Sequence, residues 1–389
     1  MAVIEKQKTT KTDLPPTSVS ESKKKIHKKF WIFTAVYFLV VIVLNILARI
    51  KVFCDFYTDH IFRIWAYTYG RLTSLAPFSV GEILVGFAVC TAIAAIVISF
   101  LLIFLHKRKR YVKFTVTYLK SFLIFLLTIA LVMTLNCSIP YGCSKLNING
   151  HIDKKYSVKE LEILRSYIVE QCNTLCGKME RDENHYIVKQ DNIESEIKEA
   201  LRSLKDEYPR FGGYYPDPKG MFGSYFMYQA NVIGVYFPFS MEANYTKYLS
   251  SSYYPSVVAH ELTHLKGYMF ENEANFFSYL ACTRSDNDYI KYSGYLSVLY
   301  FVDDDYKNCV DPETYASQVQ TANNVLFDNY CYDAQTIEYL KSKEHAVDDK
   351  VVESFSDTLT DTYLSYYNAE PNYDEVTLLL LQYYDGILY

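Results

Sequence analysis

The chain has 389 residues, half of them hydrophobic, and a formal net charge of −5. This length allows two or three structural units. The charge is unevenly divided, because residues 1–136 hold 18 Lys and Arg against 6 Asp and Glu, whereas residues 137–389 hold 21 against 38. A basic front and an acidic back indicate two environments, and the acidic part speaks against a DNA or RNA partner. We therefore expect no nucleic-acid partner.

The first third of the chain predicts a membrane anchor. Residues 1–29 are polar and contain eight lysines, which predicts a disordered basic tail. Three long apolar runs follow, at about 30–50, 80–105 and 114–136. Each run is long enough to span a bilayer. We therefore predict a transmembrane region of three helices over residues 30–136, with the lipid bilayer as a partner.

The distribution of Lys and Arg predicts the orientation of this region. The basic tail and the basic loop from His106 to Lys113 should both be cytoplasmic. Three crossings then place residues 137–389 outside the cytoplasm, as the extracytoplasmic part of a multi-pass protein of the cell membrane. Residues 55–72 between the first two runs are typical of an amphipathic helix on the outer interface, and a linker is the alternative.

A His-Glu-x-x-His motif lies at His260, Glu261 and His264. On a helix, positions i and i+4 share one face, so the two histidines can bind one metal ion from consecutive turns. Glu261 is placed to reach a metal-bound water and act as the catalytic base. This arrangement is typical of zinc metallopeptidases, with Zn²⁺ as the cofactor. An ordinary amphipathic helix with two surface histidines is the alternative, but the flanking Val257 and Leu265 favour a packed interior.

The third metal ligand is expected from a second helix. Gly267 can end the first helix in a left-handed cap, and helical spacing resumes at Glu271. We predict Glu271 as the third ligand. Glu273 is the alternative, since it lies about 200° round the helix from Glu271 and both cannot point inward. Asn275 is one turn beyond Glu271 and suits a hydrogen bond to a metal ligand.

The remainder of residues 137–389 predicts a mostly helical, α+β domain with a small sheet. Predicted helices cover 159–179, 193–204, 289–302, 313–327, 333–343, 348–367 and 373–388, whereas 209–223 and Asp303–Asp305 are predicted loops. Residues 225–239 are typical of a hairpin or a pair of strands. Part of this stretch is predicted to hold extended substrate by backbone pairing, or else only to cover the core: Val232, Ile233, Gly234, Val235 and Tyr236.

Two further groups of side chains are relevant to the chemistry. Tyr292 or Tyr295 is a candidate donor to the oxyanion of a peptidase transition state. The chain has nine cysteines, and seven follow the last apolar run at irregular spacings. We predict no disulfide connectivity from them and expect buried free thiols.

The motifs resemble one family across nearly the whole chain. The stretches Gly234-Val-Tyr-Phe-Pro238-Phe-Ser-Met-Glu242-Ala-Asn244 and His260-Glu-Leu-Thr-His264-Leu-Lys-Gly267 resemble domain-of-unknown-function family 3810. The segments 77–81 and 291–295 fit the same family. The resemblance implies a bacterial multi-pass membrane protein with a zinc-peptidase-like domain, and it supplies no substrate.

A wider similarity concerns the second helix. In several membrane or regulatory zinc peptidases, a Glu-x-x-x-Asp/Asn sequence provides the third ligand with its first residue, which corresponds to Glu271 and Asn275 here. The chain departs from the metzincins, because Phe270 stands where their third histidine would be.

These observations predict a membrane α-helical anchor followed by a zincin-like metallopeptidase domain. We expect a membrane-anchored zinc metallopeptidase that hydrolyses peptide bonds of a protein or peptide substrate at the outer face of the membrane. Cleavage should occur outside the lipid, because the motif lies far from the apolar runs. The alternative is a non-catalytic binding or sensing module stabilised by zinc, in which a fourth side chain would close the metal site.

Overall fold

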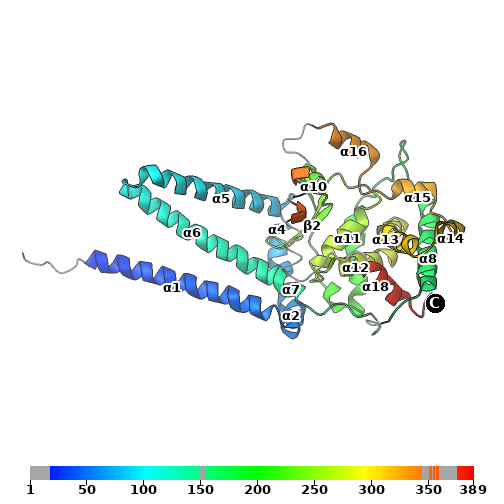
Figure 1. The fold of residues 1–389 in the computed structure, drawn as a ribbon, viewed down its shortest axis with the longest axis horizontal. Helices are drawn as coiled ribbons and strands as arrows, with labels where there is room; N and C mark the ends of the chain where they lie inside the picture. The colour runs from blue at the N-terminus through cyan, green and yellow to red at the C-terminus, as the bar shows by residue number, and fades with distance from the viewer. Residues whose placement is uncertain are drawn as a thin grey trace, which may run out of the picture.

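Three long helices project from one side of a mostly helical domain in this computed structural model (Figure 1). The structure describes residues 18–148, 150, 154–343, 350–352, 354, 356–358 and 375–389. The long helices are α1 (Ser18–Leu47), α5 (Val80–Leu105) and α6 (Lys109–Met133), and α6 continues through η3 (Thr134–Ser138) and α7 (Ile139–Tyr141). Each is long and apolar enough to cross a membrane, which confirms the three predicted apolar helices. Helix α1 begins at Ser18 rather than at Phe30, and residues 1–17 of the predicted tail lie outside the described residues.

A helical segment connects α1 to α5 and lies between the long helices and the domain. It comprises α2 (Lys51–Tyr57), η1 (Thr58–Phe62), α3 (Arg63–Trp65), η2 (Ala66–Gly70) and α4 (Arg71–Thr73). We call residues 51–73 the connecting helix. One face is buried, with Thr58, Phe62 and Thr73 against the domain, whereas Val52 and Leu72 are exposed. The predicted helix over 55–72 therefore exists, and it is apolar on its outer face as well.

The small sheet has three strands in the order β1-β3-β2. Strand β1 (Lys219–Met221) runs parallel to β3 (Glu242–Thr246), and β2 (Gly234–Phe237) runs antiparallel to β3. Gly234 pairs with Tyr245, and Phe237 pairs with Glu242. Strand β2 is therefore an edge strand of this sheet.

The positions of the strands were predicted from the sequence only in part. Residues 225–239 were predicted as a hairpin, but Ser224–Gln229 forms helix α10, and Val232 and Ile233 precede β2. Asn231, between α10 and β2, has a φ of 53°, and the antiparallel partner of β2 is the later strand β3. The predicted loop 209–223 contains β1 and the 3-10 turn η5 (Pro209–Phe211). An aromatic, β-branched composition does not by itself distinguish a short buried helix from a strand.

Besides α10, further helices make up the described part of the domain. They are α8 (Val158–Cys176), α9 (Ile193–Ser203), α11 (Tyr254–His264), α12 (Glu271–Thr283), α13 (Asp288–Cys309), α14 (Pro312–Ser317), α15 (Asn323–Asp328), α16 (Ala334–Lys341) and α18 (Glu375–Tyr384). Helix α12 packs against α9, α11, α13 and α18, and Phe276, Phe277 and Leu280 on it are fully buried. The two helices that carry the motif and Glu271 are therefore part of the core.

Two predictions in this part of the chain were wrong in detail. Asp303–Asp305 lies inside α13 rather than in a loop, and Asp303 accepts a hydrogen bond of 2.8 Å from the buried Arg165 guanidinium. The predicted helix 313–327 is divided into α14 and α15, since the Asn173 side chain hydrogen-bonds the backbone of the extended residues between them, at Gln320 and Ala322. Most of the predicted helix 348–367 lies outside the described residues. All nine cysteines are free, and most are buried.

A buried carboxylate joins the sheet to the long helices. Glu242 on β3 accepts hydrogen bonds from the backbone N–H groups of Val80 and Gly81, at 3.2 and 2.8 Å, at the start of α5. It also forms a 2.5 Å ion pair with Lys219 of β1. The Lys219 ammonium in turn donates to the carbonyl of Thr73 in the connecting helix. Because both charged groups are buried, this network fixes the position of the sheet against α5.

We expect Glu242→Ala to destabilise the full chain strongly. It leaves the Lys219 ammonium buried without its counterion, which costs about 3–5 kcal/mol. Glu199→Ala is the control, because it removes an exposed partner of Arg202, and such pairs contribute about 0–1 kcal/mol. The measurement is the midpoint of thermal unfolding in detergent. Equal midpoints for the two variants would contradict this account of the junction.

Candidate metal centre

The turn between α11 and α12 brings the two halves of the site together. Helix α11 ends at His264, and Gly267 follows with a φ of 86°, as the sequence predicted. A Cβ atom at Gly267 would lie 2.3 Å from Thr58 of the connecting helix. Glycine is therefore needed both for the left-handed backbone conformation and for the close approach. The chain then returns so that Glu271, the first residue of α12, faces α11.

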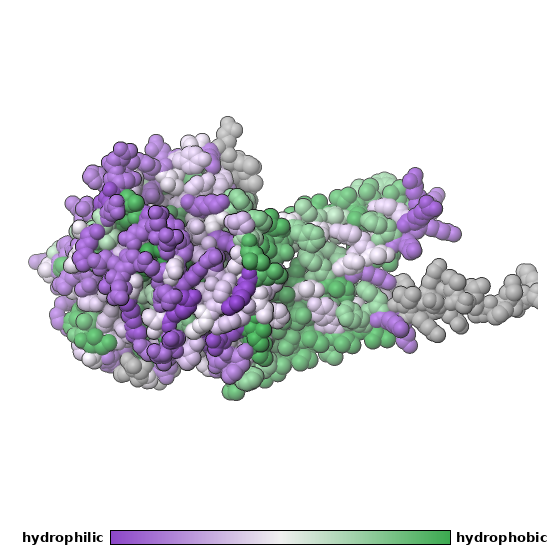
Figure 2. Space-filling model, turned by 180° about the vertical axis from the view of Figure 1, so that it is seen from behind, coloured by the Kyte–Doolittle hydropathy of each residue, from purple (hydrophilic) through white to green (hydrophobic). Residues whose placement is uncertain are grey.

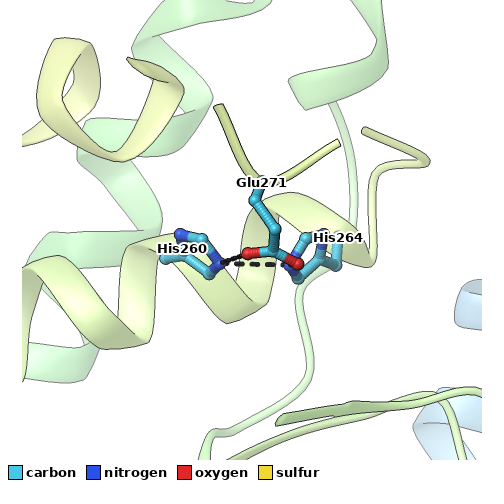
Figure 3. Close-up of side chains that lie close together, drawn as sticks. All are labelled: His260, His264 and Glu271. Carbon is cyan, nitrogen blue, oxygen red and sulfur yellow. Dashed lines mark hydrogen bonds and ion pairs between the residues drawn. The ribbon is translucent and has the colours of Figure 1, made fainter. Parts of the chain in front are cut away.

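His260, His264 and Glu271 converge on one point (Figure 3). The two Nε2 atoms are 3.1 Å apart. The Glu271 carboxylate lies 3.1 Å from His260 Nε2 and 3.7 Å from His264 Nε2. Two donors at about 2.0–2.1 Å from a tetrahedral zinc ion are about 3.3–3.4 Å apart. The spacing of these three groups therefore fits a single divalent cation.

The other ring nitrogens fix the orientation of both imidazoles. His260 Nδ1 is 2.8 Å from the side-chain oxygen of Asn275, and His264 Nδ1 is 2.8 Å from the backbone carbonyl of Tyr268. Since both partners are acceptors, each Nδ1 donates, and each Nε2 can present its lone pair to the centre. Asn275 lies where the sequence predicted it. The sequence did not predict the Tyr268 carbonyl as a partner of His264, because every residue type has a backbone carbonyl.

Glu273 points away from the cluster. Its carboxylate accepts a 2.6 Å hydrogen bond from the backbone N–H of Leu146, and its side chain is buried. The sequence left two carboxylates as candidates for the third metal ligand. The structure brings Glu271 to the histidines, whereas Glu273 binds the segment that follows α7.

Glu261 lies beside the cluster and under strand β2. Its Oε1 atom would be 2.3 Å from a Cβ atom built on Gly234, and the backbone N–H of Tyr236 donates to its carboxylate. Its Oε2 atom is buried without a hydrogen-bond partner. Burial raises the pKa of Glu261 to about 8. A buried carboxylate oxygen with a free lone pair is suited to accept a hydrogen bond from water held at the cluster.

The electrostatics of the cluster favour a bound positive charge. Although burial by itself raises the pKa of Glu271, the two histidines outweigh it and hold that pKa below its usual range. Burial also opposes a charge on His260, but Glu271 raises the pKa of that imidazole. Burial lowers the pKa of His264, which favours its neutral, metal-binding form. A cation at the centre would take the place of the proton on His260.

The cluster is partly open to solvent. The side chains of Glu271 and His260 are 28% and 16% exposed, whereas His264 is 7% exposed. Among the residues that the structure describes, no fourth His, Cys, Asp or Glu joins the group. Three protein donors and an accessible side would leave the fourth position of a tetrahedral ion free for water.

Tyr292 and Tyr295, the two candidates for an oxyanion donor, both have hydroxyl groups that are hydrogen-bonded to other side chains. The Tyr292 hydroxyl is buried and donates to Asp328, at 2.7 Å, and Asp328 also pairs with Arg181. The Tyr295 hydroxyl shares a 2.9 Å hydrogen bond with Tyr167. The Tyr295 hydroxyl thus joins α13 to α8, and the Tyr292 hydroxyl joins α13 to the end of α15.

Of the predicted substrate strand, Gly234, Val235 and Tyr236 lie in β2, next to α11. The sequence did not indicate that Gly234 makes the closest approach to Glu261. An isolated glycine within a strand pattern often marks the close approach of another group. This contact could therefore have been predicted from Gly234 itself.

We expect the full chain to bind one zinc ion at this cluster, and Glu271→Gln to weaken that binding. Loss of a group that only orients a ligand typically costs 10–100-fold in metal affinity, and loss of a ligand should cost at least about as much. Competition with a chromophoric chelator measures the affinity. Glu273→Gln is the matched control, since an amide oxygen can still accept from Leu146. Weaker binding in the control than in Glu271→Gln would reverse the assignment.

Comparison with known proteins gives one family and no individual relative. No curated protein matches the chain. No solved structure matches it either. The family described as "Protein of unknown function (DUF3810)" matches residues 57–381, which include most of the connecting helix, two of the long helices, the sheet and the residues of the candidate metal centre. The chain therefore belongs to the DUF3810 family.

Proposed function

We propose that this protein is a membrane-anchored zinc metallopeptidase that hydrolyses peptide bonds of a protein or peptide at the outer face of the membrane. The observation that carries the proposal is the convergence of His260, His264 and Glu271 with the unpartnered carboxylate oxygen of Glu261 beside them. The two imidazoles and the carboxylate are the residues that would hold the ion. Zinc bound there would lower the pKa of a water molecule towards about 7 and polarise a peptide carbonyl.

Glu261 moves the proton in this proposal. Its Oε2 atom accepts a proton from the attacking water, and the same carboxyl group gives that proton to the leaving amine nitrogen. Burial raises the pKa of Glu261 above that of an exposed glutamate, so this carboxylate takes up a proton more readily than a solvated one. The Tyr236 backbone N–H donates to this carboxylate, which keeps it in place between the strand and the histidines.

Strand β2 is the proposed substrate-binding edge. It lies at the edge of the sheet and contacts α11, so an extended peptide laid along it would pass Glu261. Edge strands bind peptides through backbone hydrogen bonds that do not depend on the side chains of the substrate. The part of the strand that fits this role is Gly234–Tyr236, since Val232 and Ile233 lie outside β2.

The membrane topology is also proposed from the sequence. The basic loop between α5 and α6 includes Lys107, Arg108 and Lys109, and positively charged loops favour the cytoplasmic side. Figure 2 shows polar residues at the far ends of the long helices and a hydrophobic surface along their length. The metal-centre residues lie outside all three apolar helices, which supports hydrolysis outside the lipid.

The alternative is a non-catalytic module that zinc stabilises. It would need a closed coordination shell, whereas Glu271 and His260 are partly exposed. The two functions differ in what they require of Glu261, since a structural zinc site has no use for a base.

We expect Glu261→Gln to lower peptide hydrolysis by about 10²–10⁴-fold, because an amide cannot accept the proton. Zinc binding should be retained, since Glu261 is not one of the three converging ligands. The assay combines zinc stoichiometry with cleavage of a peptide library by the purified full chain. Glu183→Gln, at an exposed position, is the control. If the zinc-loaded wild type cleaves no peptide, and so behaves as Glu261→Gln does, the result would favour the non-catalytic module.

We expect Gly234→Ala to reduce hydrolysis while zinc remains bound. The added Cβ atom would come within 2.3 Å of Glu261 Oε1, so the carboxylate or the strand must shift. A displacement of about 1 Å can lower a rate by about 10²-fold. Gly86→Ala is the matched control, because a Cβ atom at Gly86 meets nothing within 4 Å. Equal rates for the two variants would show that Glu261 tolerates displacement and would contradict its role as a positioned base.

A further inference from the structure

Strand β2 connects the proposed site directly to a membrane-spanning helix. At one end, Gly234 lies against Glu261, and at the other end the Phe237 ring lies against Gly81, where a Cβ atom would be 2.6 Å from it. Gly81 is in the first turn of α5. Three steps along a strand cover about 10 Å. The reacting carboxylate is therefore separated from the beginning of a membrane span by little more than the length of β2.

The turn after β2 is held by the other elements that meet the membrane. The Asn136 amide, at the end of the third long helix, donates to the carbonyl of Pro238 at 2.7 Å. The Tyr236 hydroxyl donates to the carbonyl of Asn136 at 3.2 Å. In the connecting helix, Thr73 donates to the carbonyl of Ser240 at 2.8 Å. These buried contacts, together with Glu242, keep β2 from moving away from the ends of the long helices.

Exposed apolar side chains lie at the same junction. Phe222 is 71% exposed, and its backbone N–H donates to Glu82 in the first turn of α5. Leu75, just before α5, is 80% exposed, and Leu72 is also exposed. Figure 2 shows that the hydrophobic surface of the long helices reaches the base of the domain. Aromatic and aliphatic side chains at such a position are typical of the interfacial layer of a bilayer.

We propose that the substrate is a polypeptide anchored in the same membrane, cut in an extended segment about three to six residues from the bilayer surface. This inference rests on the proposed function and adds the substrate class to it. The reaction is hydrolysis. The peptide C–N bond breaks, the acyl carbon gains the hydroxyl group of one water molecule, and the leaving nitrogen gains its proton.

The geometry favours an anchored substrate over a soluble one for two reasons. An anchored chain necessarily crosses the layer next to the bilayer where it leaves the lipid, at about the height of β2 above the start of α5, whereas nothing holds a soluble protein in that layer. Confinement to the same membrane also raises the effective concentration of the substrate at β2, as tethering does for linked binding modules.

The experiment uses zinc-loaded full chain in vesicles of phosphatidylcholine and phosphatidylglycerol. The probes are peptides of uniform repeating sequence, so that each repeat offers the same bonds. One set carries an acyl anchor at the N-terminus, another carries it at the C-terminus, and a third carries none. Mass spectrometry maps the cut positions, and Glu261→Gln gives the background.

We expect anchored peptides, of one or both polarities, to be cut about three to six residues from the anchor and about tenfold or more faster than the free peptide. A non-cleavable spacer of about ten residues next to the anchor should abolish this cleavage, whereas lengthening the free end should leave the cut position unchanged.

The inference would be overturned by Glu261-dependent cleavage that is spread evenly along the repeats and equally fast with and without an anchor. That result would leave the peptidase proposal standing. Survival of cleavage beyond the spacer would overturn it as well. If zinc-loaded wild type cuts none of the peptides, the proposed function fails, and the inference fails with it.

Discussion

The turn at Gly267 is the constraint on which the site depends. Two histidines on one helical face supply only two donors, and a third must return from another element. Gly267 has a positive φ and no room for a side chain against Thr58, so the chain can reverse within a few residues and begin α12 with Glu271 facing α11. The connecting helix takes part in this turn, which links the geometry of the metal centre to the segment that joins the long helices.

The sheet contributes to the site through its edge rather than its face. Strand β2 crosses α11 so closely that Gly234 has no space for a Cβ atom beside Glu261. The same approach buries the carboxylate, raises its pKa and leaves one of its oxygens without a partner. Burying such a group costs free energy, and the proposed role as a base gives a functional reason for the arrangement.

Buried polar contacts, rather than apolar packing alone, set the position of the domain on the long helices. Glu242 and Lys219 join β3, β1, the connecting helix and the start of α5 in one network. Asn136 adds a contact from the end of the third long helix. Hydrogen bonds have defined lengths and directions, so they fix one orientation where an apolar interface would tolerate several. The distance between β2 and the membrane helices follows from these contacts.

The sequence was sufficient to predict the features that depend on local pattern. Three apolar runs predicted three long apolar helices, since length and hydropathy are sufficient for that inference, and the motif with Gly267 predicted two helices, His260 and His264 on one face, and Glu271 and Asn275 opposite them. The other features follow from the three-dimensional structure. The three-dimensional structure distinguishes Glu271 from Glu273, which helical periodicity alone had left open. The Glu273 carboxylate accepts a hydrogen bond from the backbone N–H of Leu146, far away in the chain. The structure also places a helix where one strand of the predicted hairpin was expected, and it engages Tyr292 and Tyr295 in the core. Partners distant in sequence settle these features, and a single sequence does not specify which distant groups meet.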